Sequence, residues 1–118
     1  MAGFSAYQQT AIETESNGRI IVKLYDGAIR FLRQALEAIK AGDFERKGNL
    51  IIKARNIVLE LSAALDMEAG GEISQNLRSL YNFILQRLTI ANIKCEPNTI
   101  KEVIDLLANL NESWKKIA

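Results

Sequence analysis

The sequence predicts an all-α protein folded as an antiparallel up-down-up-down four-helix bundle, and three observations support this prediction. First, only one proline and seven glycines occur among 118 residues, so few residues would interrupt long helices. Second, hydrophobic residues recur at steps of three and four in four stretches, as they do on one face of a helix. Third, short turns separate these stretches, which favours antiparallel neighbours. We expect helices at about residues 17–41, 43–66, 72–94 and 99–117.

The first predicted helix has a broad apolar face, which indicates neighbouring helices on two sides. On its narrow polar side, Asp26/Arg30 and Arg33/Glu37 are four residues apart, a spacing at which each pair contributes roughly 0.2–0.5 kcal/mol. The centre of the apolar face consists of Ile21, Tyr25, Ala28, Leu32, Ala35 and Ile39.

A tight turn leads into the second predicted helix. Gly42 suits a left-handed helix cap, and the Asp43 carboxylate can cap the next helix, which we expect to end near Asp66. The predicted core stripe of this helix is Leu50, Ala54, Ile57, Leu61 and Ala64.

The third predicted helix follows Gly70-Gly71 and ends near Lys94. Its expected core stripe is Ile73, Leu77, Leu80, Ile84, Leu88 and Ala91.

Pro97 separates the third and fourth predicted helices, and Thr99 with Glu102 matches a capping box that would start the fourth. The fourth stripe has heptad spacing: Ile100, Val103, Leu107, Leu110, Trp114 and Ile117. Residues 17–118 therefore form the predicted bundle, and residues 1–16 form a flexible N-terminal segment outside it.

Composition excludes several classes of protein. Hydrophobic residues at 48% and charged residues at 25% are typical of a soluble globular domain, and a net charge of +1 disfavours nucleic-acid binding. The chain has no histidine and one cysteine, Cys95, so four-ligand zinc sites and internal disulfides are excluded and no cofactor is expected. Cys95 has no histidine to act as its base, so we expect no enzyme. The N-terminus lacks an apolar run, which predicts a cytoplasmic protein without membrane insertion.

Four hydrophobic residues fall away from the predicted core stripes. Ile52 and Leu59 lie nearly opposite the core face of the second helix, and Phe83 and Ile90 lie about 80–100° from the core centre of the third. If the two stripes adjoin, they form an exposed groove suited to an amphipathic partner helix. A homodimer contact or a wide core would produce the same pattern.

Three blocks of residues resemble the flagellar secretion chaperones known as FliS. The first block is Ile21-Val22-Lys23-Leu24-Tyr25-Asp26-Gly27-Ala28-Ile29. The second runs from Gly70-Gly71-Glu72-Ile73-Ser74-Gln75-Asn76-Leu77 through Leu80-Tyr81 and Arg87-Leu88 to Ala91-Asn92. The third is Leu110-Asn111-Glu112-Ser113-Trp114. One departure is that Asn17 and Gly18 follow Ser16 where many members have proline, which should fray the start of the helix.

The resemblance implies a cytoplasmic chaperone that binds the disordered C-terminal segment of flagellin. It implies that this binding prevents premature polymerisation and assists delivery to the flagellar export apparatus, with the apparatus and flagellar regulators as further partners. It also implies that the N-terminal segment can fold over the same surface, which makes Tyr7 and Ile12 candidate capping residues. A structural four-helix dimerisation module is the alternative class.

Overall fold

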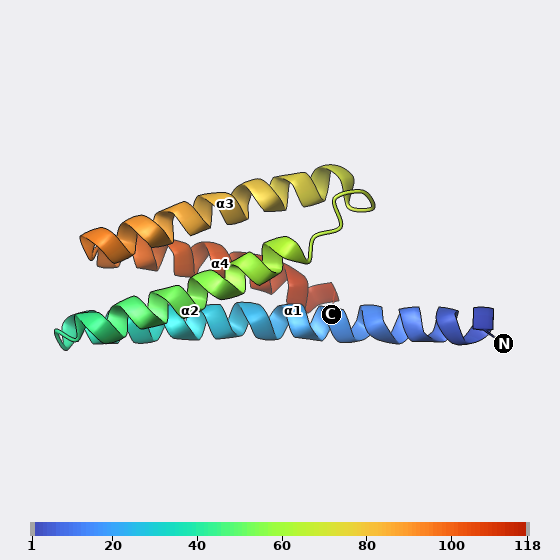
Figure 1. The fold of residues 1–118 in the computed structure, drawn as a ribbon, viewed down its shortest axis with the longest axis horizontal. Helices are drawn as coiled ribbons and strands as arrows, with labels where there is room; N and C mark the ends of the chain where they lie inside the picture. The colour runs from blue at the N-terminus through green and yellow to red at the C-terminus, as the bar shows by residue number, and fades with distance from the viewer. Residues whose placement is uncertain (1, 118) are drawn as a thin grey trace.

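The structure, a computed structural model, describes residues 2–117 and the side chains of residues 18–117. As predicted, this part of the chain contains four α-helices (Figure 1). They are α1 (Ala2–Lys40), α2 (Phe44–Ala63), α3 (Gly71–Lys94) and α4 (Pro97–Ile117). None of the helices in the described residues is long and apolar enough to cross a membrane.

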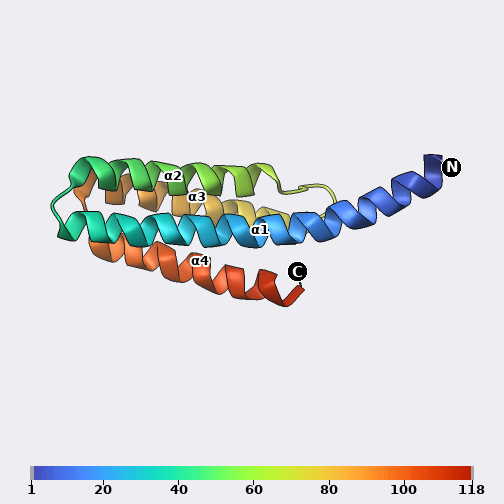
Figure 2. The ribbon, with the colours of Figure 1, turned by 90° about the horizontal axis from the view of Figure 1, so that it is seen from below.

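The helices form a four-cornered bundle. In the described residues α1 packs against α2 and α4, and α3 packs against the same two helices, so α1 and α3 lie diagonally across the core. Figure 2 shows α1 between α2 and α4, with α3 behind. The α2–α3 face and the α1–α4 face therefore lie on opposite sides of the molecule.

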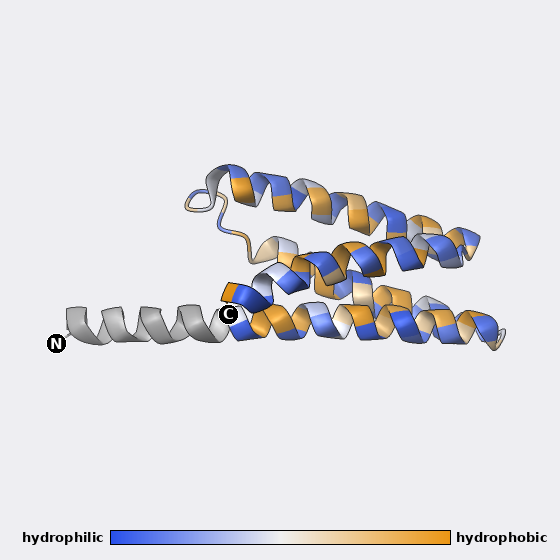
Figure 3. Ribbon diagram, turned by 180° about the vertical axis from the view of Figure 1, so that it is seen from behind, coloured by the Kyte–Doolittle hydropathy of each residue, from blue (hydrophilic) through white to orange (hydrophobic). Residues whose placement is uncertain are grey.

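The core agrees with most of the predicted stripes. Hydrophobic residues gather where the helices face one another (Figure 3), and their burial is the main source of stability. The predicted core residues with no exposed surface are Tyr25, Ala28, Leu32, Ala35, Ala54, Ile84, Leu88, Ala91, Ile100, Val103 and Leu107.

Three residues expected in the core are on the surface: Ala64, just after the end of α2, together with Ile73 and Ile117. Ile73 is 72% exposed and Ile117 is 77% exposed, because they lie at the start of α3 and the end of α4, where the neighbouring helices no longer cover them. In α2, Ile51 and Val58 are buried although the predicted stripe omitted them. The buried face of α2 is thus rotated from the one predicted, and Ile57 lies at its edge.

The turn between α1 and α2 has the predicted geometry. Gly42 has φ +73°, a left-handed conformation that glycine adopts without the strain a Cβ would cause. Asp43 caps α2, because its Oδ1 accepts a hydrogen bond from the Arg46 backbone N–H at 3.1 Å.

The second helix ends at Ala63 rather than near Asp66. The Asp66 carboxylate accepts hydrogen bonds from the backbone N–H groups of Glu68 at 3.1 Å and Ala69 at 2.9 Å. Such bonds to the following backbone stabilise a turn in competition with a helix.

The fourth helix begins at Pro97, and the predicted capping box is wrong. Proline suits the first helical position because its missing N–H would have no helical partner there. Thr99 Oγ1 instead donates to Glu96 Oε2 at 2.9 Å, and Glu102 forms an ion pair with Arg87 of α3 at 2.9 Å.

The first helix begins at Ala2, not at Asn17. No proline occurs in residues 2–17, and the alanine, glutamine and glutamate residues there favour a helix. The side chains of Tyr7 and Ile12 lie outside those that the structure describes, so their capping role stays a prediction.

Trp114 packs against the core and is only partly exposed. Its Nε1 donates to the Tyr25 hydroxyl at 3.3 Å. We expect the folded protein to show blue-shifted tryptophan emission and weak quenching by iodide, because the indole is partly shielded from water. The same protein unfolded in urea is the control, and an identical spectrum in both states would contradict this placement.

Candidate functional site

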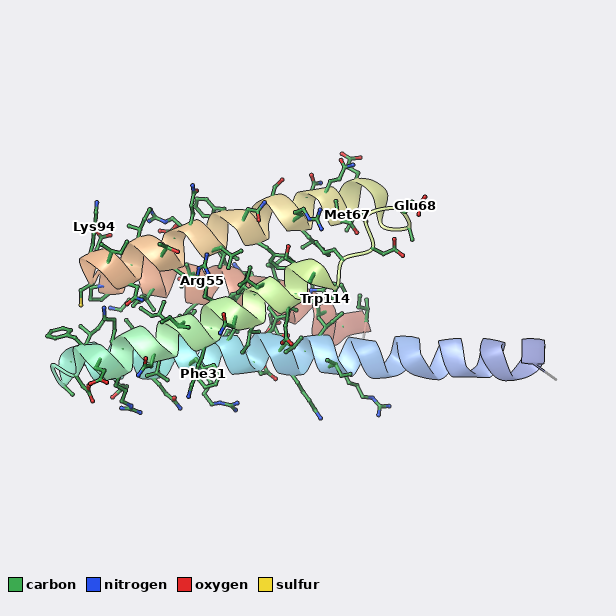
Figure 4. All side chains as sticks on the ribbon, in the orientation of Figure 1. Phe31, Arg55, Met67, Glu68, Lys94 and Trp114 are labelled. Carbon is green, nitrogen blue, oxygen red and sulfur yellow. The ribbon has the colours of Figure 1, made fainter. Side chains whose placement is uncertain are left out.

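The groove was predicted between the apolar stripes of α2 and α3, and these two helices lie side by side. Lys47 of α2 is buried, and its Nζ donates to the Asn92 carbonyl oxygen at 2.8 Å and to Asn92 Oδ1 at 3.0 Å. Further along, Arg55 Nε donates to Thr89 Oγ1 at 3.2 Å, and Figure 4 labels Arg55 on this face. These bonds set the register of the two antiparallel helices.

Three of the four predicted groove residues are well exposed. Ile52 is 50% exposed, Leu59 42% and Phe83 43%, whereas Ile90 is half-buried. In the register set by the Lys47 and Arg55 bonds, Ile52 lies at about the level of Ile90 and Leu59 at about the level of Phe83. The two levels are seven residues apart, or about 10 Å at 1.5 Å per residue.

Arg55 lies between the two apolar levels. It is three residues after Ile52 and four before Leu59, so all three side chains share one face of α2. The Arg87 guanidinium lies 6.0 Å from the centre of the Phe83 ring and forms an ion pair with Glu102 of α4, so Phe83 lies on the α4 side of α3. Thr89, which bonds Arg55, marks the side of α3 that faces α2, so the predicted stripes of α2 and α3 do not adjoin as one groove. We call Ile52, Arg55, Leu59, Phe83 and Ile90 the α2–α3 surface.

A second apolar feature, which the sequence did not predict, is a cavity of ≈ 270 Å³ where the bundle opens beside the α2–α3 turn. We call it the end cavity. Gly70 is required there, because a Cβ at this position would collide with the Ser74 side chain. The lining residues are Ile21, Leu61, Ala64, Leu65, Asp66, Gly70, Ile73, Ser74, Leu77, Tyr81 and Trp114.

A buried hydrogen-bonded cluster forms one wall of the end cavity. The hydroxyls of Tyr25 and Tyr81 are 2.5 Å apart, and Tyr25 also accepts from Trp114. Burial raises the pKa of both tyrosines, so both hydroxyls are protonated near neutral pH. One N–H and two O–H donors therefore share two acceptor oxygens, and one hydroxyl hydrogen has no acceptor within the cluster.

The chemistry of these features is that of a binding surface. Both the α2–α3 surface and the end cavity present apolar side chains, with Arg55 as the cation between the two apolar levels. In the described residues no three cysteine or carboxylate side chains gather as a metal site would require. Cys95 lies at the end of α3 in a left-handed conformation with φ 53°.

Comparison with known proteins gives consistent matches over the chain. The model of the family described as flagellar protein FliS matches residues 1–118. The chain is 39% identical to the flagellar secretion chaperone FliS of Salmonella typhimurium over 122 residues, covering 99% of this chain and 90% of the relative. It is 34% identical to that of Bacillus subtilis over 113 residues, covering 96% and 84%.

Proposed function

The chain belongs to the FliS family of flagellar secretion chaperones, and we propose that its client is the disordered C-terminal segment of flagellin. Binding in the cytoplasm prevents premature polymerisation of flagellin and assists its delivery to the export apparatus. The observation that carries this proposal is the α2–α3 surface, where large apolar side chains from two neighbouring helices remain exposed. Large exposed apolar side chains on two neighbouring helices of a small protein are typical of a binding surface.

The spacing of the α2–α3 surface suits an amphipathic client helix. Apolar client residues seven positions apart meet the Ile52 level and the Leu59 level, because two helical turns span the same distance. A client carboxylate midway between them meets Arg55. The end cavity accepts a further apolar side chain of the client beside Ile73.

The proposal is tested by titrating the full chain with a flagellin C-terminal peptide. We expect one-to-one binding, a gain of helicity by circular dichroism and a negative heat-capacity change by calorimetry, because folding of the client buries apolar surface. A scrambled peptide of the same composition is the control. Absence of heat and of any spectral change would contradict the chaperone function, and a concentration-dependent mass that the peptide does not alter would favour a dimerisation module.

We further propose that residues 1–16 compete with the client for this surface. Deleting residues 1–16 is then expected to raise client affinity by about two- to tenfold, because the binding-competent state becomes more populated. The measurement is calorimetry of the truncated and full chains with the same peptide, after circular dichroism has shown that both are folded. Reduced affinity would indicate that Tyr7 and Ile12 contact the client, and equal affinity would exclude both roles.

A further inference from the structure

The helices α1 and α4 lie side by side on the face opposite the α2–α3 surface (Figure 2). Three hollows of ≈ 420, ≈ 350 and ≈ 300 Å³ follow one another along the seam between these two helices. The first two share Asp26 and Lys115, and the last two share Arg33. The hollows therefore form one continuous feature, the α1–α4 groove.

Two polar contacts connect α1 and α4 in the middle of the groove. Asp26 Oδ1 accepts from Asn111 Nδ2 at 2.7 Å and lies 3.6 Å from Lys115 Nζ. The predicted Asp26/Arg30 pair is therefore replaced, within the described residues, by a contact between the two helices. Asp26 is already paired, which leaves the positive charge of Arg30 available to a partner.

The α1–α4 groove is strongly basic although the chain as a whole carries a net charge of only +1. Seven lysine and arginine side chains of the described residues line the three hollows, against three carboxylates. Five of these cations are Lys23, Arg30, Arg33, Lys40 and Lys101. Such local concentration of one sign of charge attracts an oppositely charged partner and orients it.

One end of the groove combines this charge with an apolar floor. Leu36, Ile39 and Pro97 lie in the hollow of ≈ 300 Å³, and Arg33 and Lys101 are among the cations around them. A hollow of this size is at the lower end of the range of about 300–1,000 Å³ for ligand pockets. It would accept an apolar side chain whose neighbours in sequence are acidic.

We propose that the α1–α4 groove binds an acidic segment of a second partner protein, with one apolar side chain of that segment over Leu36, Ile39 and Pro97. Because this groove and the α2–α3 surface are on opposite faces, the segment binds without displacing flagellin.

The composition of the groove favours protein over nucleic acid. Glu37 and Glu112 alternate with the cations and would repel a continuous phosphate backbone, and the exposed Asp105 is one turn from Lys101. Among the side chains that the structure describes, no aromatic group on which bases could stack lines the three hollows.

The test uses the full chain and a synthetic helical peptide of about 20 residues, which spans about 30 Å of groove. The peptide carries a stripe of glutamates and one leucine, and a second version carries serine in place of leucine. We expect fluorescence anisotropy to detect binding that weakens with added salt and that falls several-fold for the serine version. Amide resonances of α1 and α4, rather than those of α2 and α3, should shift.

Two charge-reversal variants, one in the groove and one outside it, form a matched test and control. Arg33→Glu with Lys101→Glu is expected to weaken peptide binding at least tenfold. Arg78→Glu with Lys94→Glu changes the net charge equally on exposed positions of α3 and should change binding less than threefold. Circular dichroism checks that both variants are folded.

Four results would overturn the proposal. They are equal weakening by both double variants, absence of binding at low salt, displacement of the acidic peptide by the flagellin peptide, and tighter binding of an oligonucleotide or of anionic vesicles at the same residues. If the flagellin peptide does not bind, the proposed client is refuted. The proposal for the α1–α4 groove is tested separately, by the acidic peptide.

Discussion

Leu59→Ala and Phe83→Ala are each expected to weaken binding of the flagellin peptide by at least about 1 kcal/mol, and the double variant by about 3 kcal/mol. Each single variant should change the free energy of unfolding by less than about 1 kcal/mol, because both side chains are already half exposed and their removal leaves no closed cavity. Calorimetry measures the affinity, and urea unfolding measures the stability of the same samples.

Two control variants show whether client affinity and the free energy of unfolding change independently of each other. Ile93→Ala removes a highly exposed apolar residue of α3 outside the two levels and should alter neither quantity. Leu88→Ala truncates a fully buried residue of the same helix and should cost about 2–5 kcal/mol of stability. Unchanged affinity in the Leu59 and Phe83 variants, or a loss of stability like that of Leu88→Ala, would exclude the α2–α3 surface as the client site.

The Tyr25 hydroxyl is expected to matter more to stability than the Tyr81 hydroxyl. Tyr25→Phe removes the acceptor of the Trp114 N–H and the partner of the Tyr81 hydroxyl, which leaves one part-buried and one buried donor unpaired. Because each unsatisfied buried group costs about 1–3 kcal/mol, we expect a loss of about 2–4 kcal/mol. Tyr81→Phe leaves the bond from Trp114 to Tyr25 intact and should cost about 1 kcal/mol.

The double variant Tyr25→Phe with Tyr81→Phe shows whether the loss of stability comes from unpaired hydrogen-bond donors or simply from the smaller side-chain volume. Adding Tyr81→Phe to Tyr25→Phe removes one of the two unpaired donors, so the double variant should be no less stable than Tyr25→Phe alone. Urea midpoints at an unchanged slope give the comparison. Additive costs, or equal costs for the two single variants, would show that hydrogen bonding in the cluster does not control its stability.

Features that depend on a residue's place around its own helix were predictable from the sequence. The steps of three and four placed Tyr25, Leu32 and Leu107 in the core and Ile52, Leu59 and Phe83 outside it, because helical geometry assigns each residue a direction. The turn at Gly42 and Asp43 was predictable for a similar reason, since each residue acts through its own backbone preference or a bond three residues away.

Features that join distant residues were decided only by the tertiary structure. The bonds from Tyr25 to Tyr81 and from Trp114 to Tyr25 connect positions 56 and 89 residues apart, and the end cavity brings together parts of all four helices. Periodicity specifies which way a side chain points but not how far one helix is shifted or tilted against another. Side-chain packing across the whole bundle sets those quantities. For this reason Ile73 is exposed, Val58 is buried, and the basic residues of α1 and α4 line a single groove.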